Sequence, residues 1–125
     1  MPNLFDVVIM NVEGIISYRG TKYCVCVSVS ENKYLFINSS SRRMYDDFQI
    51  EASDYPFLND LNRFVACSRI YFIEPSRAIR TVGRLNFADA GKVVAKIKKS
   101  WTVLKKDKDS ILPGLEDCLL NDIMF

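Results

Sequence analysis

The sequence predicts a mainly β domain that ends in an α-helix, an α+β fold, and two patterns along the chain support this. Over the first two thirds, short apolar runs rich in Val, Ile, Tyr and Phe are separated by polar turn residues, which is typical of β-strands and hairpins. Over the last third, apolar residues recur every three or four positions, which is the period of a helix. At 125 residues the chain has the usual size of one domain, so we expect a single domain over 1–125.

The first predicted elements are a strand and a hairpin. Residues 5–10 form a β-rich run. From 23 to 29 the side chains alternate, with Tyr and Val on one side and Cys and Ser on the other, so both faces of this strand are apolar or small. Such a strand is expected at the centre of a sheet. Four turn residues and the apolar run 34–37 then complete a hairpin over about 22–38.

A polar loop at 38–43 follows the hairpin, and strand patterns return at 48–50 and at 64–73. A helix is predicted over about 86–101, with Asn86 as its N-cap. One stripe of this helix is apolar and is expected to face the sheet; it consists of Phe87, Ala90, Val94, Ile97 and Trp101.

Pro113 and Gly114 are expected to stop any second helix after the first one. Residues 105–125 are therefore predicted to form a C-terminal tail, whose acidic, amphipathic part over 115–125 is expected to form a short helix. Trp101 and the end of this tail would either cap the core of a monomer or contribute to an interface between two copies of the chain.

Composition excludes several classes of protein. The longest apolar runs have four or five residues, whereas a membrane-spanning helix needs roughly 20, and no secretory signal is expected. Cys24 and Cys26 are two apart and cannot bridge to each other on one strand face, so the four cysteines are expected to be buried thiols of a cytoplasmic protein. The chain has no histidine and no CxxC pair, so we expect no metal site, no cofactor and no Ser–His or Cys–His nucleophile.

Positive charge is concentrated in the middle of the chain. The net charge is only +2, but residues 63–108 hold twelve basic and three acidic side chains. The segments before and after this stretch are both net negative. A basic stretch of this kind attracts a polyanion if the fold gathers it on one face; the alternative is a solvated helix face with scattered arginines.

Two loops carry the candidate site residues. They are Arg19 and Lys22 before the predicted central strand, and Ser39, Ser40, Arg42 and Arg43 after its hairpin partner. In a tightly curled sheet, the start of one strand and the end of its antiparallel partner lie at the same end. Cations and hydroxyls gathered there suit a phosphodiester, because cations stabilise charge at phosphorus and hydroxyls bond its oxygens. The alternative is two ordinary polar loops.

Three segments and the entry to the helix carry a family resemblance. They are residues 34–40, 54–58 and 64–71, followed by Val82-Gly83-Arg84-Leu85. Together they resemble the MazF/PemK-like toxins of bacterial type II toxin–antitoxin systems, over about residues 5–101. The resemblance implies an SH3-like small β-barrel over about 5–82 with a C-terminal helix. It also implies a homodimer and an acidic antitoxin protein as partner.

The resemblance implies a metal-independent endoribonuclease that cleaves single-stranded RNA, in which a 2′-hydroxyl attacks the adjacent phosphate and leaves a cyclic phosphate. Lys22 matches the position of the family's catalytic Arg, and Ser39 or Ser40 matches its Ser or Thr. Arg19 would join Lys22 at the phosphate. Arg42 and Arg43 would bind substrate.

The general base is the weak point of this assignment, because no histidine exists and no carboxylate is obviously placed. Asp46 and Asp47, in the same loop, are the best candidates. The chain also departs from the family pattern: Phe5-Asp6 keeps only the acid of a Gly-Asp pair, and the segment before the second strand has Lys22 in place of Arg and lacks its proline. A lysine holds phosphate less rigidly than an arginine. The alternative function is therefore a non-catalytic module of the same fold that binds a protein or a nucleic acid.

Overall fold

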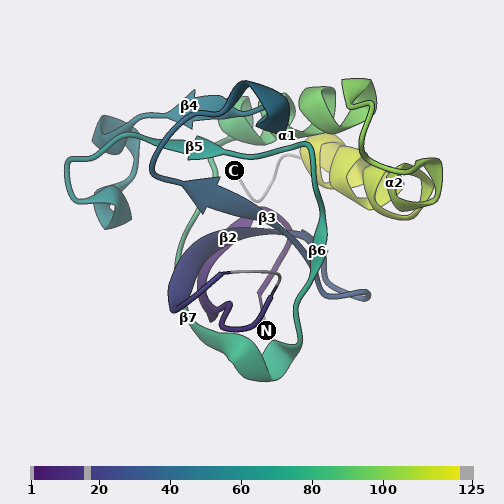
Figure 1. The fold of residues 1–125 in the computed structure, drawn as a ribbon. Helices are drawn as coiled ribbons and strands as arrows, with labels where there is room; N and C mark the ends of the chain where they lie inside the picture. The colour runs from purple at the N-terminus through teal and green to yellow at the C-terminus, as the bar shows by residue number, and fades with distance from the viewer. Residues whose placement is uncertain (1, 16–17, 122–125) are drawn as a thin grey trace.

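The computed structural model describes residues 2–15 and 18–121, in which one strongly curved sheet packs against two helices (Figure 1). The strands are β1 (Asp6–Asn11), β2 (Thr21–Ser28), β3 (Lys33–Asn38), β4 (Phe48–Ile50), β5 (Arg63–Val65), β6 (Tyr71–Phe72) and β7 (Ala78–Arg84). The helices are α1 (Phe87–Lys99) and α2 (Lys105–Asn121). The predicted α+β fold, a β-sheet followed by a C-terminal helical part, is confirmed.

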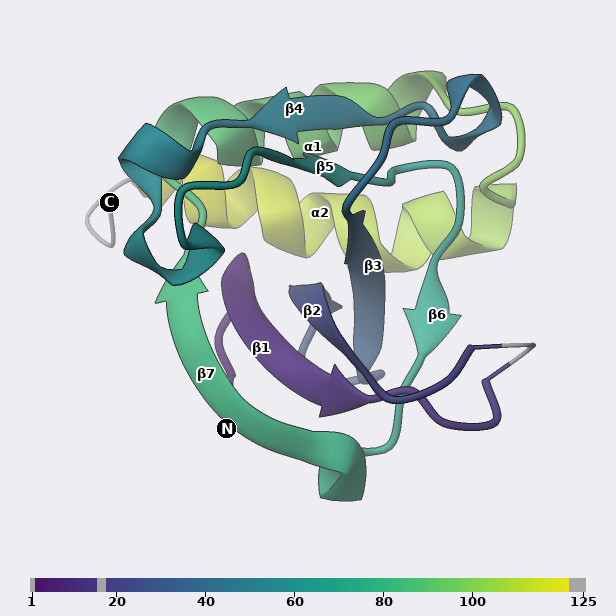
Figure 2. The same cartoon turned by 60° about the vertical axis from the view of Figure 1, so that its left-hand side comes forward.

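The strands follow the order β4-β5-β3-β2-β1-β7, with β6 also paired to β3, and each of these pairings is antiparallel. The predicted β2–β3 hairpin is present, with Tyr23 opposite Ile37 and Val25 opposite Leu35. The central place predicted for β2 is confirmed as well. Figure 2 shows β1 and β7 curving together beneath the helices. No pairing joins β4 to β7 within the described residues, so the closed SH3-like barrel is not confirmed.

Both faces of the central strands are buried, which explains the apolar character of both sides of β2. On one face, Val25, Leu35 and Ile37 pack with α1 and α2 in the larger core. On the opposite face, Cys24 and Phe36 belong to a second core that β6 and the β1–β2 connection help to close. The sheet is thus a central layer with apolar side chains packed on each side.

Helix α1 begins where the sequence predicted, because the Asn86 side chain accepts a hydrogen bond from the Asp89 N–H at 2.8 Å. Ile97 is fully buried against the sheet, as expected. The predictions for Phe87 and Trp101 were wrong: the Phe87 side chain is 49% exposed and that of Trp101 is 98% exposed. The helix ends at Lys99, and the ammonium of Lys108 donates to the carbonyl oxygens of Lys98 at 3.0 Å and Ser100 at 2.7 Å. The chain therefore leaves the helical path before it reaches Trp101.

Helix α2 corrects a second prediction, because it runs through Pro113 and Gly114 without stopping. A proline inside a helix removes the hydrogen bond to the carbonyl four residues earlier, here that of Asp109. Asp109 and Pro113 are both exposed, so water can solvate that carbonyl. Ile111 and Leu115 are buried in the larger core on either side of the proline, and this packing holds both halves of the helix.

Two further predictions needed adjustment. The strand pattern predicted over 64–73 is two short strands, β5 and β6, separated by a non-strand segment. All four cysteines are free, and three of them are buried as expected; they are Cys24, Cys26 and Cys67. Cys118, on α2, is only half-buried.

Candidate functional site

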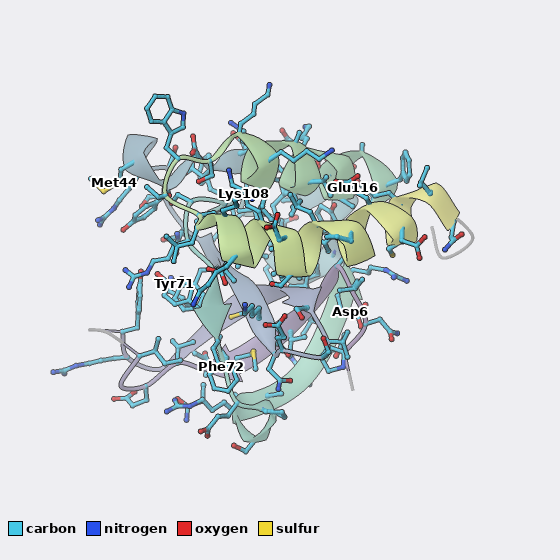
Figure 3. All side chains as sticks on the ribbon, turned by 90° about the vertical axis from the view of Figure 1, so that its right-hand side faces the viewer. Asp6, Met44, Tyr71, Phe72, Lys108 and Glu116 are labelled. Carbon is cyan, nitrogen blue, oxygen red and sulfur yellow. The ribbon has the colours of Figure 1, made fainter. Side chains whose placement is uncertain are left out.

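The largest of the depressions described here lies at one end of the second core, between β3, β6 and the 39–45 loop, and has a volume of about 700 Å³. Its lining combines aromatic rings with two arginines. We call it the aromatic groove and define it by Tyr18, Phe36, Tyr45, Tyr71, Arg42 and Arg69. Figure 3 labels Tyr71 and Met44, and both of these side chains line the groove.

The rings of the aromatic groove are packed on one another. Phe36 and Tyr71 are stacked, with ring centroids 4.0 Å apart and an angle of 8° between their planes. Tyr18 contacts Phe36 edge-on at 5.0 Å. The guanidinium of Arg69 lies 5.2 Å from the ring centroid of Tyr71. Burial, together with the neighbouring Tyr18, raises the pKa of Tyr71 to about 12, so its hydroxyl remains neutral and able to donate.

A smaller depression of about 230 Å³ shares walls with the aromatic groove. We call it the Lys22 depression; it is lined by Lys22, Asn38, Ser39, Ser40 and Arg42 together with Tyr18 and Tyr45. The structure therefore brings together four of the predicted site residues: one lysine, two serines and one arginine. They come from the start of β2 and from the loop after β3, as the hairpin geometry predicted.

Lys22 is fixed in this depression by polar and aromatic contacts. Its ammonium donates to Asn38 Oδ1 at 2.6 Å and lies 5.1 Å from the ring centroid of Tyr18 and 5.5 Å from that of Phe36. Burial lowers the pKa of Lys22 below its ordinary value; the negative charge that Cys24 can carry acts against this effect, and the positive charge of Arg63 adds to it. Lys22 is thus a positioned cation that releases its proton more readily than an exposed lysine.

The 39–47 loop owes its shape to Asp47. The carboxylate of Asp47 accepts hydrogen bonds from the Ser41 hydroxyl and from the Arg42 N–H, both at 2.9 Å. The carbonyl of Tyr45 accepts from two backbone N–H groups of the segment after β5, which ties the loop to that segment. The Arg42 guanidinium then lies 5.7 Å from the ring centroid of Tyr45. Asp47 therefore positions Arg42 rather than facing the depression.

The remaining predicted site residues are placed differently. Arg19 is exposed in the β1–β2 connection and lines none of the depressions described here. Asp46 is exposed and lines none of them either. Arg43 begins a short 3-10 turn, and its side chain lies outside what the structure describes. The general base predicted at Asp46 or Asp47 thus has no support from their positions.

Several basic side chains of residues 63–108 form ion pairs or hydrogen bonds outside the two depressions. Lys92, Lys98 and Lys105 pair with carboxylates on the helices, and the Arg77 guanidinium donates to backbone carbonyls. Of the basic residues in 63–108, Arg69 lines the aromatic groove, and Arg63 lines a further depression next to Lys22. The described part of the chain contains no group of three or more side chains that could hold a metal ion. It also contains no helix long and apolar enough to cross a membrane.

Sequence reasoning missed the aromatic residues of the groove. Tyr18 and Tyr45 each lie within three or four residues of a predicted cation, and alternation of aromatic and basic residues is a known sign of single-strand nucleic-acid binding. Tyr71 carried no such signal. Its stacking on Phe36 depends on the pairing of β6 with β3, between residues far apart in the sequence.

The fold and the groove define a small antiparallel β domain with two C-terminal helices and an aromatic, cationic surface depression. No family model matches the sequence, and no curated protein matches it. Thirty chains of solved structures match the fold. One of them is an endoribonuclease from a mycobacterial species in complex with its cognate antitoxin, at a TM-score of 0.61 and 14% sequence identity, covering 83% of this chain and 98% of that one. At this identity the likeness shows a shared fold.

Proposed function

We propose that this protein is a toxin-like endoribonuclease that cleaves single-stranded RNA without a metal ion. The observation that carries the proposal is the continuity of the aromatic groove with the Lys22 depression, which share Tyr18, Asn38, Arg42 and Tyr45. Aromatic rings beside cations are suited to a single strand, because bases stack on rings and phosphates pair with the cations. The fold shared with an endoribonuclease agrees with this reading.

In the proposed reaction, the 2′-oxygen of a ribose attacks the adjacent phosphorus and the bond to the 5′-oxygen of the next nucleotide breaks, which leaves a cyclic phosphate. The Lys22 ammonium stabilises the negative charge that develops on the phosphate oxygens, and Ser39 and Ser40 donate hydrogen bonds to them. Arg42 holds the phosphate, and Arg19 and Arg43 attract the strand. Because the pKa of Lys22 is lowered, its ammonium also protonates the departing 5′-oxygen. The proton of the 2′-hydroxyl passes to water.

We also propose two protein partners. The first is an acidic antitoxin, whose negative charge would cover the cations of the groove; the mycobacterial endoribonuclease of the same fold is in complex with its cognate antitoxin. The second is another copy of this chain, since Trp101 is a large apolar side chain left in water by the single chain.

The alternative function is a binding module of the same fold without turnover. It is favoured by the lysine at position 22, where a bidentate arginine would hold phosphate more rigidly. It is also favoured by the lining of the two depressions, to which no described carboxylate contributes as a general base.

The deciding experiment is an RNA cleavage assay in EDTA with purified wild type, Lys22→Ala and Lys99→Ala. We expect the wild type to cut single-stranded RNA and to leave cyclic phosphate ends. Lys22→Ala should lower the rate by about 10²-fold, as loss of one preorganised charge stabiliser does. Lys99 is exposed at the end of α1 and lines neither depression, so Lys99→Ala should leave the rate nearly unchanged.

Equal losses in the two variants would mean that Lys22 acts only through diffuse attraction. Binding of RNA or of a protein without any cleavage by the wild type would establish the binding module instead.

A further inference from the structure

Arg63, the first residue of β5, has a guanidinium without a polar partner among the residues that the structure describes. Its Nε atom is buried and has no hydrogen-bond acceptor, and no ion pair or hydrogen bond of this side chain occurs within residues 2–15 and 18–121. The guanidinium carbon lies 5.3 Å from the ring centroid of Tyr23. A buried donor without an acceptor is destabilising, so such a group points to a missing ligand.

The surroundings of Arg63 are suited to an anion. Arg63 and Lys22 line a depression of about 320 Å³ together with the hydroxyls of Thr21 and Ser39, and apolar side chains complete the walls. We call it the Arg63 depression. None of its lining residues is acidic, and the positive charge of Arg63 contributes to the lowered pKa of Lys22. An anion bound at Arg63 would offset the repulsion between these two positive charges.

The Arg63 depression is continuous with the Lys22 depression. Lys22 and Ser39 line both the Arg63 depression and the Lys22 depression. Arg63 comes from β5 and Lys22 from β2, the two strands on either side of β3, so the sheet itself fixes their positions. A polyanion that passes over Lys22 can therefore reach Arg63 on one side and the aromatic groove on the other.

We propose that the Arg63 depression binds a phosphate of the RNA backbone next to the phosphate that is cleaved. The arginine fork donates to the phosphate oxygens through Nε and a terminal nitrogen, and the hydroxyls of Thr21 and Ser39 donate to the remaining oxygens. The identity of the ligand as RNA rests on the proposed function. The presence of a phosphate site follows from the unpaired arginine and the lining of the depression.

The first test uses inorganic phosphate alone. Phosphate that binds the folded protein raises its melting temperature, because ligand binding stabilises the folded state by mass action. We expect a phosphate-dependent rise, measured against chloride at equal ionic strength, in the wild type and in Arg80→Gln, and a smaller rise in Arg63→Gln. Arg80 is a matched control because it is exposed on β7 and lines none of the three depressions. Equal rises in wild type and Arg63→Gln would overturn the proposal.

The second test uses RNA in which the cleaved position, mapped beforehand, carries a 2′-deoxy sugar so that binding is measured without cleavage. A neutral methylphosphonate replaces one phosphate at a time. At one phosphate next to the cleaved phosphate, the methylphosphonate should weaken the binding of the RNA to wild type and to Arg80→Gln. It should not weaken the binding of the RNA to Arg63→Gln. Arg63→Gln should also lower the slope of log affinity against log salt by about 0.7, the value for one contact to a single strand.

The outcomes separate the two proposals. If RNA is cut but Arg63→Gln gives the same methylphosphonate profile as the wild type, the Arg63 site is wrong and the endoribonuclease stands. If phosphate stabilises the wild type through Arg63 but no RNA is bound or cut, the phosphate site stands and the proposed function is wrong.

Discussion

Lys22 is a lysine whose surroundings oppose its positive charge. Burial is the main cause of its lowered pKa, and Asn38 together with two aromatic rings holds the ammonium in place. The protein keeps this costly group at the meeting point of two depressions. Titratable groups whose pKa is shifted by partial burial are typical of functional sites.

This lowered pKa predicts the pH dependence of cleavage. Only the protonated ammonium carries charge, so kcat/KM should fall as the pH rises through the pKa of Lys22, which lies below the ordinary lysine value of 10.5. Lys22→Arg keeps the charge at every accessible pH, so the alkaline fall should disappear in this variant. The measurement is a kcat/KM profile from about pH 6 to pH 10. Lys99→Arg is the control and should keep the wild-type profile; an alkaline fall that persists in Lys22→Arg would belong to another group.

The cysteines predict a clear difference in reactivity. Burial raises the pKa of the Cys24, Cys26 and Cys67 thiols to about 12, so almost no thiolate is present near neutral pH. Cys118 is only half-buried on α2. A thiol reagent should therefore modify Cys118 in the folded protein and the other three only after denaturation. Mass spectrometry of the modified peptides checks this, and rapid labelling of Cys24 in the native state would contradict the packing of the second core.

The candidate site could be predicted only in part. Lys22, Ser39, Ser40 and Arg42 were found because they lie in two loops at one end of a hairpin, and a hairpin is a local feature of the sequence. The partners that depend on distant pairings were missed: Tyr71 joins through β6, and Arg63 through β5.

At the scale of elements, the 52–58 segment is fastened to α1 by a buried polar network. The Tyr55 hydroxyl donates to Asp89 Oδ2 at 2.5 Å and accepts from the Asn86 N–H at 3.0 Å. Tyr55 and Asp89 are both buried. Burial, followed by the bond to Asp89, raises the pKa of Tyr55, so its hydroxyl stays a donor.

Removal of this hydroxyl should destabilise the fold. Tyr55→Phe removes the hydrogen bond to Asp89 Oδ2 and leaves the buried carboxylate with Lys92, 3.7 Å from Oδ1, so we expect a loss of about 1–3 kcal/mol in the free energy of unfolding. Urea denaturation measures this as a lower midpoint with an unchanged m value. Tyr34→Phe is the control, because Tyr34 is equally buried but no described residue forms a hydrogen bond with its hydroxyl. Equal losses in both variants would mean that the network contributes nothing specific.

The wrong predictions about helices and strands have one cause: contacts between distant parts of the chain determine where these elements begin and end. Periodicity placed Trp101 on the stripe of α1, but the Lys108 ammonium caps the carbonyls at the end of that helix and the chain turns away. Pro113 was expected to stop a helix, but buried Ile111 and Leu115 hold α2 on both sides of it. Most of β7 is exposed, so it lacks the alternation that reveals a half-buried strand; its pairing with β1 defines it instead.

At the scale of the whole molecule, an exposed apolar side chain indicates where the protein would contact a partner. Trp101 is 98% exposed, yet its neighbours are held firmly: the Thr102 hydroxyl donates to the Ser68 carbonyl, and the Thr102 N–H donates to the Ser100 hydroxyl at 3.3 Å. The residue next to Trp101 is therefore held in place beside the aromatic groove, which Thr102 lines. A tryptophan left in water is the kind of side chain that dominates binding interfaces.

The proposed homodimer therefore predicts that Trp101 becomes buried as the protein concentration rises. Trp101 is the sole tryptophan of the chain, so quenching of its fluorescence by acrylamide reports on this position alone. We expect strong quenching in dilute solution, weaker quenching at concentrations where sedimentation velocity shows dimers, and a monomer at all of these concentrations for Trp101→Ser. Leu120→Ser is the control, because Leu120 is 83% exposed near the end of α2, about 20 positions further along the chain. A dimer in which acrylamide quenches Trp101 as strongly as in the monomer would place the interface on another surface and leave Trp101 free for the antitoxin or the RNA.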